Sequence, residues 1–349
     1  MIIGLPGRPM LGFKLVYSED YFLPIGEHVF ASQKFRLVHQ RLLGEGLEPE
    51  NFVRPQPASD DDVRLAHTAE WIHKLHSATL TTREELALEV PFSPELVHAF
   101  WTHAGGSILA AELALRDGVA INLGGGFHHA FPEHGEGFCM INDVAIAVLR
   151  MFKDGKASRA MVLDCDVHQG NGTAVIFNPE AAATPPTGSW SAPLLQPQRA
   201  VSVRETVPGD VFTISLHQEN NYPAWKPASS LDVNLPDGTT DAEYLSWLDN
   251  ALSSALRQFE PDLIAYVAGA DPYWDDQLGG LSLTLDGLKQ RDEMVFSAAQ
   301  ARHIPIFTVF AGGYARHVED TVRIHANTVV AATEIFGRQR GEDRNRRIG

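Results

Sequence analysis

The chain is poor in cysteine and in long apolar runs. Only two of its 349 residues are cysteines, Cys139 and Cys165. That is too few for a disulfide framework or a thiolate metal cluster, so we expect both to be small buried residues. No run of about 18 or more apolar residues occurs, which argues against a transmembrane helix. Residues 1–14 lack the charged and apolar regions of a signal peptide. These absences predict a soluble protein of a reducing compartment, the cytoplasm.

Positive charge is also scarce. The chain has 28 Lys and Arg against 44 Asp and Glu, a formal net charge of −16. Because an acidic surface repels phosphate groups, we expect no nucleic-acid partner, and without an apolar span we expect no membrane partner. Such a charge can attract a basic substrate, for example a lysine-rich peptide or a polyamine, although it also keeps a protein in solution. Oligomer formation is left open.

Short apolar runs recur along the chain and alternate with helical patterns. The runs are continuously apolar, as expected of parallel strands that are covered on both faces. The predicted strands are Phe13–Tyr17, Val119–Leu123, Ala160–Cys165, Val211–His217, Leu263–Ala268 and Ile306–Phe310. The clearest predicted helices are Pro94–Arg116, Asp241–Phe259 and Leu285–Arg302. This alternation predicts a single α/β domain with a mostly parallel central sheet flanked by helices.

Two segments differ from the rest of this domain, which we place at residues 1–337. Residues 180–210 are rich in Ala, Pro, Ser and Thr and show no clear period, so we expect a loop insertion there. Loops of this length are usually functional or mobile, and our hypothesis is a rim, a lid or an oligomer contact. The tail, residues 338–349, is charged, and we expect it to be frayed.

Polar side chains follow the predicted strands, where the loops of a parallel sheet converge and bind ligands. The residues in these positions are His128, His129, Asp166, His168, His217, Asp271 and Tyr314. Several strands therefore deliver polar groups to one edge of the sheet. Only His217, at the end of its strand, is better explained as a buried and hydrogen-bonded residue.

The sequence Asp164-Cys165-Asp166-Val167-His168 predicts a metal site. In an extended segment alternate side chains share a face, and two carboxylates beside an imidazole are costly to bury without a cation. Asp and His suit zinc or ferrous iron; the alternative is an exposed loop that caps the next helix. Asp271 is the candidate third ligand, and three ligands leave an open position for water, as in catalytic sites. Asp275 and Asp276, in the same loop, are better explained as cap and turn residues.

Two glycine-rich segments supply further candidates. His128 and His129 follow three glycines, and on such a turn both imidazoles can enter one pocket, one as a general base and the other as an electrostatic partner. Tyr314 follows Gly312 and Gly313 and can aim its hydroxyl at a developing oxyanion. The alternatives are a surface pair of histidines and an aromatic side chain that covers the edge of the sheet.

Four strings, taken together, resemble the histone deacetylase superfamily. They are GGGFHHAFPEHGEGFCMINDVAIA, VLDCDVHQGNGTA, GADPYWDDQLGGLSLT and AGGYA, and the resemblance runs in order from about Phe13 to about Ile335. The HQGNG motif and the WTHAGGSILAAELAL helix are most similar to the class IV branch and its bacterial relatives. The resemblance implies the arginase/deacetylase fold.

The resemblance also implies roles for individual residues. Asp166, His168 and Asp271 match the metal ligands, with zinc expected and ferrous iron as the alternative. The catalytic set is His129 as general base, His128 as its partner held by Asp164, Tyr314 at the oxyanion, and Asn171 in contact with His129. The substrate-binding set is Gly137, which offers its carbonyl, together with Phe138, Tyr222 and Gly313. A structural potassium ion is expected at Asp164, Asp166, His168, Ser215 and Leu216.

The expected activity is zinc-dependent removal of an acyl group from an N-acyl-lysine by metal-activated water. The sequence departs from the class I pattern at Asn171, where that class has Asp, and near Pro91–Glu95 it has no clear match to the class I loop carboxylate that holds a peptide backbone. Four alternatives stay open: acetylpolyamine hydrolysis, removal of long acyl chains, arginase-like hydrolysis with two metal ions, and a catalytically silent metal-binding module.

Overall fold

The computed structural model describes residues 11–183 and 207–346, and within them the strands form one sheet. The strands are β1 (Leu15–Val16), β2 (Phe52–Val53), β3 (Val119–Asn122), β4 (Arg159–Asp164), β5 (Asp210–Gln218), β6 (Leu231–Leu235), β7 (Leu263–Val267) and β8 (Ile306–Val309). Their order is β2-β1-β3-β8-β7-β4-β5-β6, and every neighbouring pair is parallel. The predicted α/β fold with a parallel central sheet is therefore confirmed.

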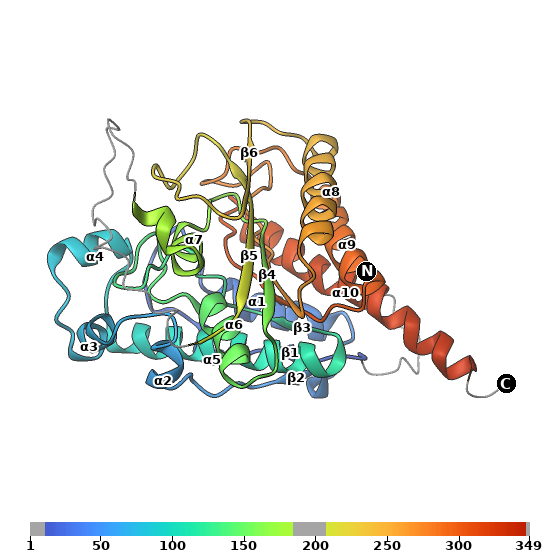
Figure 1. The fold of residues 1–349 in the computed structure, drawn as a ribbon, viewed down its shortest axis with the longest axis horizontal. Coiled ribbons are helices and arrows are strands. Elements are labelled where there is room, and N and C mark those ends of the chain that lie inside the picture. Colours follow the sequence, from blue (N-terminus) through green and yellow to red (C-terminus); the bar gives the residue numbers. More distant parts are fainter. Residues whose placement is uncertain (1–10, 184–206, 347–349) are drawn as a thin grey trace.

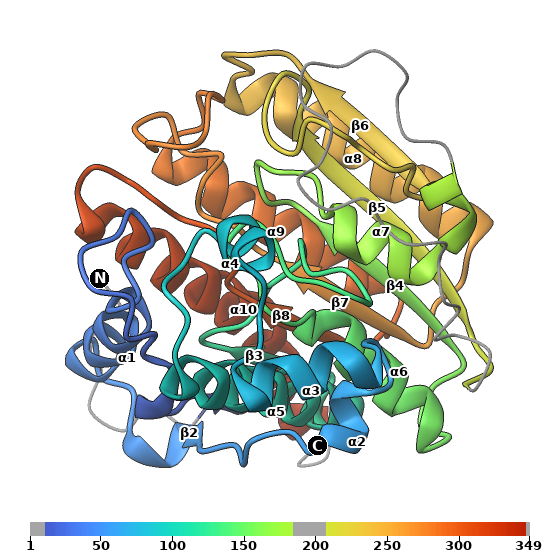
Figure 2. The same ribbon diagram turned by 90° about the vertical axis from the view of Figure 1, so that its left-hand side faces the viewer.

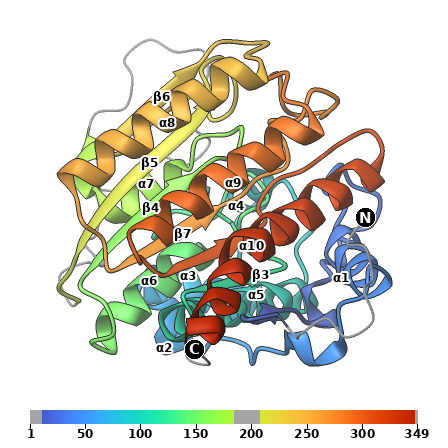
Figure 3. The same cartoon turned by 90° about the vertical axis from the view of Figure 1, so that its right-hand side faces the viewer.

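Helices cover both faces of this sheet. They are α1 (Lys34–Gly44), α2 (Asp60–Val63), α3 (Ala69–Ser77), α4 (Thr82–Leu88), α5 (Pro94–Asp117), α6 (Asp143–Lys153), α7 (Asn171–Phe177), α8 (Asp241–Gln258), α9 (Leu285–Ala301) and α10 (Val318–Arg346), with 3₁₀ turns at Glu19–Tyr21, Pro49–Asn51 and Pro179–Ala183. Helices α5, α6 and α7 lie on one face (Figure 2). Helices α8, α9 and α10 lie side by side on the other (Figure 3).

The predicted strands and the three predicted helices lie within two residues of their expected bounds, but helix α10 and the edge strands β2 and β6 were not predicted. Both strands are short and only partly buried, so neither has the continuous apolar run of a central strand. Helix α5 shows why some ends could be predicted. The Ser93 side chain accepts a hydrogen bond from the Leu96 backbone N–H, and Gly118 ends the helix with a φ of 90°.

Helix α10 is longer than the sequence indicates. It continues to Arg346, through residues 338–346 where we expect a frayed tail, and Figure 1 shows its end projecting from the body of the molecule. The composition of this stretch explains the difference, because its Arg, Gln and Glu residues are good helix formers. The predicted insertion meets the described residues only at its two ends, since 184–206 lie outside them.

A buried arginine fixes the ends of β4 and β7. Arg291 of α9 is fully buried, and its Nη1 donates to the Gly269 carbonyl at 2.6 Å and to the Cys165 carbonyl at 3.3 Å. Asp292 balances its charge at 2.9 Å and also accepts from the Tyr266 hydroxyl at 2.6 Å. Because a buried charge needs a partner and hydrogen bonds, this network holds in place the two strand ends that lead into the predicted metal ligands.

Candidate metal centre and active site

The order of the sheet brings the predicted site residues together. Strands β3, β8, β7 and β4 are neighbours, and the segments after their carboxyl ends carry the histidine pair, Tyr314, Asp271 and the Asp166–His168 segment. One pocket is lined by His128, His129, Asp166 and Tyr314, with Phe138 among its other walls. The crossover connections therefore assemble groups that are far apart in the sequence.

Asp166, His168 and Asp271 form a three-residue cluster. Their candidate ligand atoms all lie within 4.8 Å of one another, and among the described residues no other group of this kind occurs. All three side chains are buried, so the alternative of an exposed loop does not hold. Asp164 is not part of the cluster, because its Oδ2 lies 2.7 Å from Nδ1 of His128 instead.

The charges of this cluster fit a divalent cation. Nδ1 of His168 lies 3.1 Å from Oδ1 of Asp166 and 3.4 Å from Oδ2 of Asp271, and this buried Asp271 oxygen accepts no hydrogen bond. Burial and the negative charge of Asp166 raise the pKa of Asp271 to about 7. Two carboxylates and an imidazole that converge in a buried site suit zinc or ferrous iron, and the cation would remove the cost of burying them.

Gly312 allows the two carboxylates to approach the strand β8 loop. Its backbone N–H donates to Oδ2 of Asp166 at 2.9 Å. A Cβ atom at this position would lie 1.9 Å from Oδ2 of Asp271 and 2.6 Å from Oδ2 of Asp166. Any side chain would therefore displace the predicted ligands.

The two adjacent histidines have different partners. Nδ1 of His128 lies 2.7 Å from Asp164, whereas Nδ1 of His129 lies 2.8 Å from Oδ1 of Asn171, and the two Nε2 atoms are 3.1 Å apart. Both rings are buried, so the alternative of a surface pair does not hold. Desolvation lowers the pKa of His128, but the charges of Asp164 and Asp166 outweigh it and raise that pKa to about 9. Desolvation and the positive charge of His128 lower the pKa of His129 well below its usual value.

Two acidic residues of this region were not predicted. Asp143, at the start of α6, accepts the backbone N–H groups of Gly126 and Phe127 and so holds the turn that precedes the histidines. Glu136 accepts a hydrogen bond from Nδ2 of Asn171 at 2.5 Å. Two features of the sequence could have indicated these residues. Asp143 stands at the start of a helix, and Glu136 is an acidic residue between two glycines.

Tyr314 is held by its backbone. Its N–H donates to Oδ2 of Asp276 at 2.7 Å, and Asp276 also accepts the backbone N–H groups of Leu278 and Gly279. The expectation that Asp276 is a turn residue is therefore confirmed. The ring of Tyr314 lies 6.3 Å from that of His168, so the tyrosine packs beside the metal cluster, not over the outer edge of the sheet.

Gly137 and Phe138 line the pocket, and Tyr222 lies next to Gly137 and His129. Gly137 has a φ of 53°, and a Cβ there would lie 2.9 Å from the Tyr222 ring and 3.0 Å from Cδ2 of His129. Tyr222 packs edge-on against His129, with ring centroids 4.9 Å apart, and the Phe138 ring lies 5.9 Å from that of Tyr314. Gly312 lines the pocket, whereas Gly313 packs against Thr321 of α10, and its role in substrate binding stays a prediction.

The residues of the predicted potassium site lie on the neighbouring strands β4 and β5 and in the segment that follows β4. In the register of β4 and β5, Asp164 pairs with Ser215, and Leu216 follows as a buried residue. The hydroxyl of Ser215 lies 2.9 Å from Nδ1 of His217. His217 is thus buried and hydrogen-bonded, as expected, while the potassium site stays a prediction.

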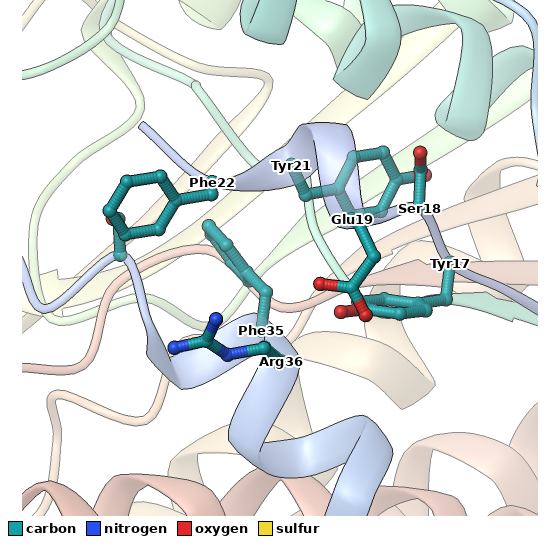
Figure 4. A pocket seen from close by; sticks show the side chains of 8 residues that line it. Tyr17, Ser18, Glu19, Tyr21, Phe22, Phe35 and Arg36 are labelled. Atoms are coloured by element: carbon teal, nitrogen blue, oxygen red, sulfur yellow. The ribbon is translucent and has the colours of Figure 1, made fainter. Parts of the chain in front are cut away.

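A second hollow lies apart from this site, near the start of the chain (Figure 4). It is lined by Tyr17, Glu19 and Arg36 among others, and burial together with the neighbouring Glu19 raises the pKa of Tyr17. None of the site residues predicted from the sequence lies there. The chemistry is therefore concentrated in the pocket at the carboxyl ends of the strands.

Comparison with known proteins shows the family. The histone deacetylase domain matches residues 28–329. The chain is 38% identical to an uncharacterised protein of Picosynechococcus sp. over 93% of this chain and 100% of that protein. It is 32% identical to histone deacetylase 2 of Arabidopsis thaliana, over 92% and 79% of the two chains. The chain belongs to the histone deacetylase family.

Solved structures agree with the fold. A histone deacetylase homologue from Aquifex aeolicus superposes with a TM-score of 0.69 at 22% identity, over 91% of this chain and 83% of that one. The HD domain of HDA15 gives a TM-score of 0.69 at 19% identity, over 93% and 90%. The arginase/deacetylase fold implied by the resemblance is thus confirmed. Within the described residues, no helix is both long and apolar enough to cross a membrane.

Proposed function

We propose that this chain is a zinc-dependent amidohydrolase that removes an acyl group from the side chain of an N-acyl-lysine. The observation that carries the proposal is that the buried cluster of Asp166, His168 and Asp271 meets, at Asp166, a pocket that His129 and Tyr314 also line. Membership of the histone deacetylase family supports a hydrolase that acts on amides. The asparagine at position 171 and the HQGNG motif favour a class IV-like member of the family.

The residues of the pocket divide the work of hydrolysis. Zinc, or ferrous iron, held by Asp166, His168 and Asp271 would supply a Lewis acid that polarises the amide carbonyl and acidifies water. His129 has the lowered pKa of a base that is free to accept a proton near neutral pH, and it takes the proton of the attacking water. The hydroxyl of Tyr314 donates to the developing oxyanion. The amine leaves after a histidine protonates it.

The aromatic side chains near the site and the net charge of the chain support a lysine substrate. Phe138 and Tyr222 supply apolar surface for the alkyl chain of lysine, and the Gly137 carbonyl is the proposed acceptor for the substrate amide N–H. The net charge of −16 would attract a basic peptide. The same charge makes an acetylated polyamine the second candidate substrate. Removal of longer acyl chains is a variant of the same chemistry.

The remaining alternatives find less support. An arginase-like mechanism needs a second metal ion with its own ligands, and the described residues contain one candidate ligand cluster. A silent metal-binding module has no chemical need for the buried pair His128 and His129 beside Tyr314. We also propose a potassium ion close to Asp164, Asp166, His168, Ser215 and Leu216; the pairing of Asp164 with Ser215 in β4 and β5 supports it.

An activity screen tests the proposal. The zinc-loaded protein is assayed on acetyl-, octanoyl- and myristoyl-lysine peptides and on acetylpolyamines, with Tyr314→Phe and His129→Ala as controls. We expect hydrolysis of at least one lysine amide that both variants reduce strongly. Hydrolysis of acetylpolyamines alone would select the second candidate. No hydrolysis of any amide with zinc bound would favour the silent module, and a pair of bound metal ions would favour arginase-like chemistry.

A further inference from the structure

Glu136 is separated from the proposed general base, His129, by Asn171. It touches neither the metal cluster nor His129. Its side chain is almost fully buried. Oε1 accepts two hydrogen bonds, from Nδ2 of Asn171 at 2.5 Å and from the hydroxyl of Tyr222 at 3.0 Å. Oε2 lies 3.7 Å from Nε2 of His134. A buried acid in contact with Asn171 and Tyr222, which both contact His129, calls for an explanation.

The explanation begins with the two ends of the Asn171 amide. An amide can present either its oxygen or its NH₂ group to a neighbour, and the choice decides what that neighbour must be. A carboxylate oxygen such as Oε1 of Glu136 only accepts, so the amide must turn its NH₂ toward Glu136. The opposite end, Oδ1, then faces Nδ1 of His129 at 2.8 Å and the backbone N–H of Gly172 at 3.0 Å.

This orientation decides the tautomer of His129. Because an acceptor faces Nδ1, that nitrogen must carry the proton, and the lone pair of neutral His129 is left on Nε2. Nε2 is the atom that lies 3.1 Å from the corresponding nitrogen of His128, on the lining of the pocket. If the amide turned over, its NH₂ would face Nδ1, and the proton would move to Nε2, where it blocks base catalysis.

We propose that Glu136 is a positioning residue that orients the Asn171 amide and thereby keeps Nε2 of His129 free to act as the base. An aspartate at position 171 would need no such support, since both of its oxygens accept. The pair Asn171–Glu136 thus presents an acceptor to Nδ1 of His129 through a neutral amide and a more distant acid. A single carboxylate at position 171 would present the same acceptor by direct contact. This inference rests on the proposed function only in the step that calls His129 the base.

Two other roles are distinguishable. Glu136 could instead bind the cationic part of a substrate, since it touches Tyr222, a residue proposed to bind substrate; its removal would then raise KM and leave the tautomer unchanged. The backbone N–H of Gly172 could by itself orient the amide, since it donates to the same oxygen; removal of Glu136 would then change neither the tautomer nor kcat.

The direct test is the ¹⁵N NMR spectrum of the His129 imidazole, recorded with and without zinc and assigned by comparison with His129→Ala. We expect wild type to carry the proton on Nδ1, and Glu136→Leu to show a mixture of both tautomers. Glu136→Gln should keep the wild-type tautomer, because its amide oxygen can still accept from Asn171. Glu133→Gln is the matched control: Glu133 lies near His134, and its loss should change nothing.

Kinetics give the second test. In Glu136→Leu we expect kcat to fall on the order of tenfold, a part of the roughly 10²–10⁴-fold that a general base contributes, while KM stays within about twofold. Adding Asn171→Asp to Glu136→Leu should restore kcat and the single tautomer. Asn171→Asp alone should be poorer than this double variant, because it places a second carboxylate against Glu136.

Each outcome decides the matter. A single wild-type tautomer in Glu136→Leu, a higher KM at unchanged kcat, or a failure of Asn171→Asp to rescue would overturn the proposal. If Glu136→Leu does not fold, Glu136→Gln takes its place in the double variant: it should raise kcat in the Asn171→Asp background and not in wild type, and any other pattern counts against the proposal. If the tautomer responds as expected but no amide is hydrolysed, the proposed function fails and the orienting role stands.

Discussion

His128 and His129 are neighbours in the chain, equally buried, and 3.1 Å apart at their Nε2 atoms, yet their pKa values shift in opposite directions. A carboxylate, Asp164, contacts His128, whereas a neutral amide, Asn171, contacts His129. Burial alone would lower both pKa values. The comparison teaches that the partner on Nδ1, and not the depth of burial, decides which histidine holds a proton and which one accepts it.

The largest effect is expected from His129→Ala compared with His128→Ala. If only His129 is the base, its loss should lower kcat by about 10²–10⁴-fold, and His128→Ala should cost clearly less. Both variants should still bind zinc, because neither residue is in the ligand cluster. Steady-state kinetics with a zinc titration measure this. Equal losses in the two variants would show that the histidines share the proton work.

Tyr314→Phe removes the hydroxyl that is proposed to donate to the developing oxyanion, whichever histidine takes the proton of the attacking water. We expect kcat to fall by about 10²–10³-fold, as for the loss of one oxyanion donor, with KM little changed. The backbone contact of Tyr314 with Asp276 is kept in this variant, so the melting temperature should not move. A large rise in KM instead would make Tyr314 a binding residue.

Asp164→Asn makes the partner of His128 neutral, like that of His129. The protonated form of His128 is present below its pKa of about 9. Without the charge of Asp164 that pKa falls, so the proton is lost at lower pH. We expect the alkaline limb of the kcat–pH profile to move to lower pH. If the pKa falls by about two units, kcat at pH 8 should fall by about tenfold, since the protonated fraction of His128 then drops from about nine-tenths to about one-tenth. An unmoved alkaline limb would mean that Asp164 serves only the structure.

Asn171→Asp makes the opposite exchange and gives the smallest effect. A carboxylate beside His129 favours its protonated form and raises its pKa. The base must be neutral to accept a proton, so the acid limb of the pH profile should move to higher pH. The alkaline limb should stay in place. A kcat/KM profile from pH 5 to 9 measures the shift. An unchanged profile would contradict the assignment of His129 as the base.

Most residues of the candidate site could be predicted from the sequence, because they occur in long motifs that follow one another in a fixed order. Asp166 and His168 follow a predicted strand directly, and Tyr314 follows two glycines, so their meeting at one edge of a parallel sheet could be predicted from strand polarity alone. The role of Asp276 as a turn residue was equally visible.

Contacts between distant segments could not be predicted in the same way. Glu136 meets Asn171 across 35 positions of the chain, and Tyr222 reaches the same acid from beyond β5. The edge strand β6 and the helical end of α10 were missed because their stability comes from pairing and helix propensity, and not from an apolar run.

What the sequence by itself determined is the inventory: a parallel α/β sheet, one acidic and histidine-rich edge, and the family to which these strings belong. What only the tertiary structure decided is the surroundings of these groups. It showed the contacts of Asp164 with His128 and of Asn171 with His129 that the resemblance implies, and it placed Glu136 against Asn171, which the sequence did not indicate. The physical reason is that a side chain's type is local, whereas its hydrogen-bond partner, its desolvation and its pKa depend on which distant segments the fold packs around it.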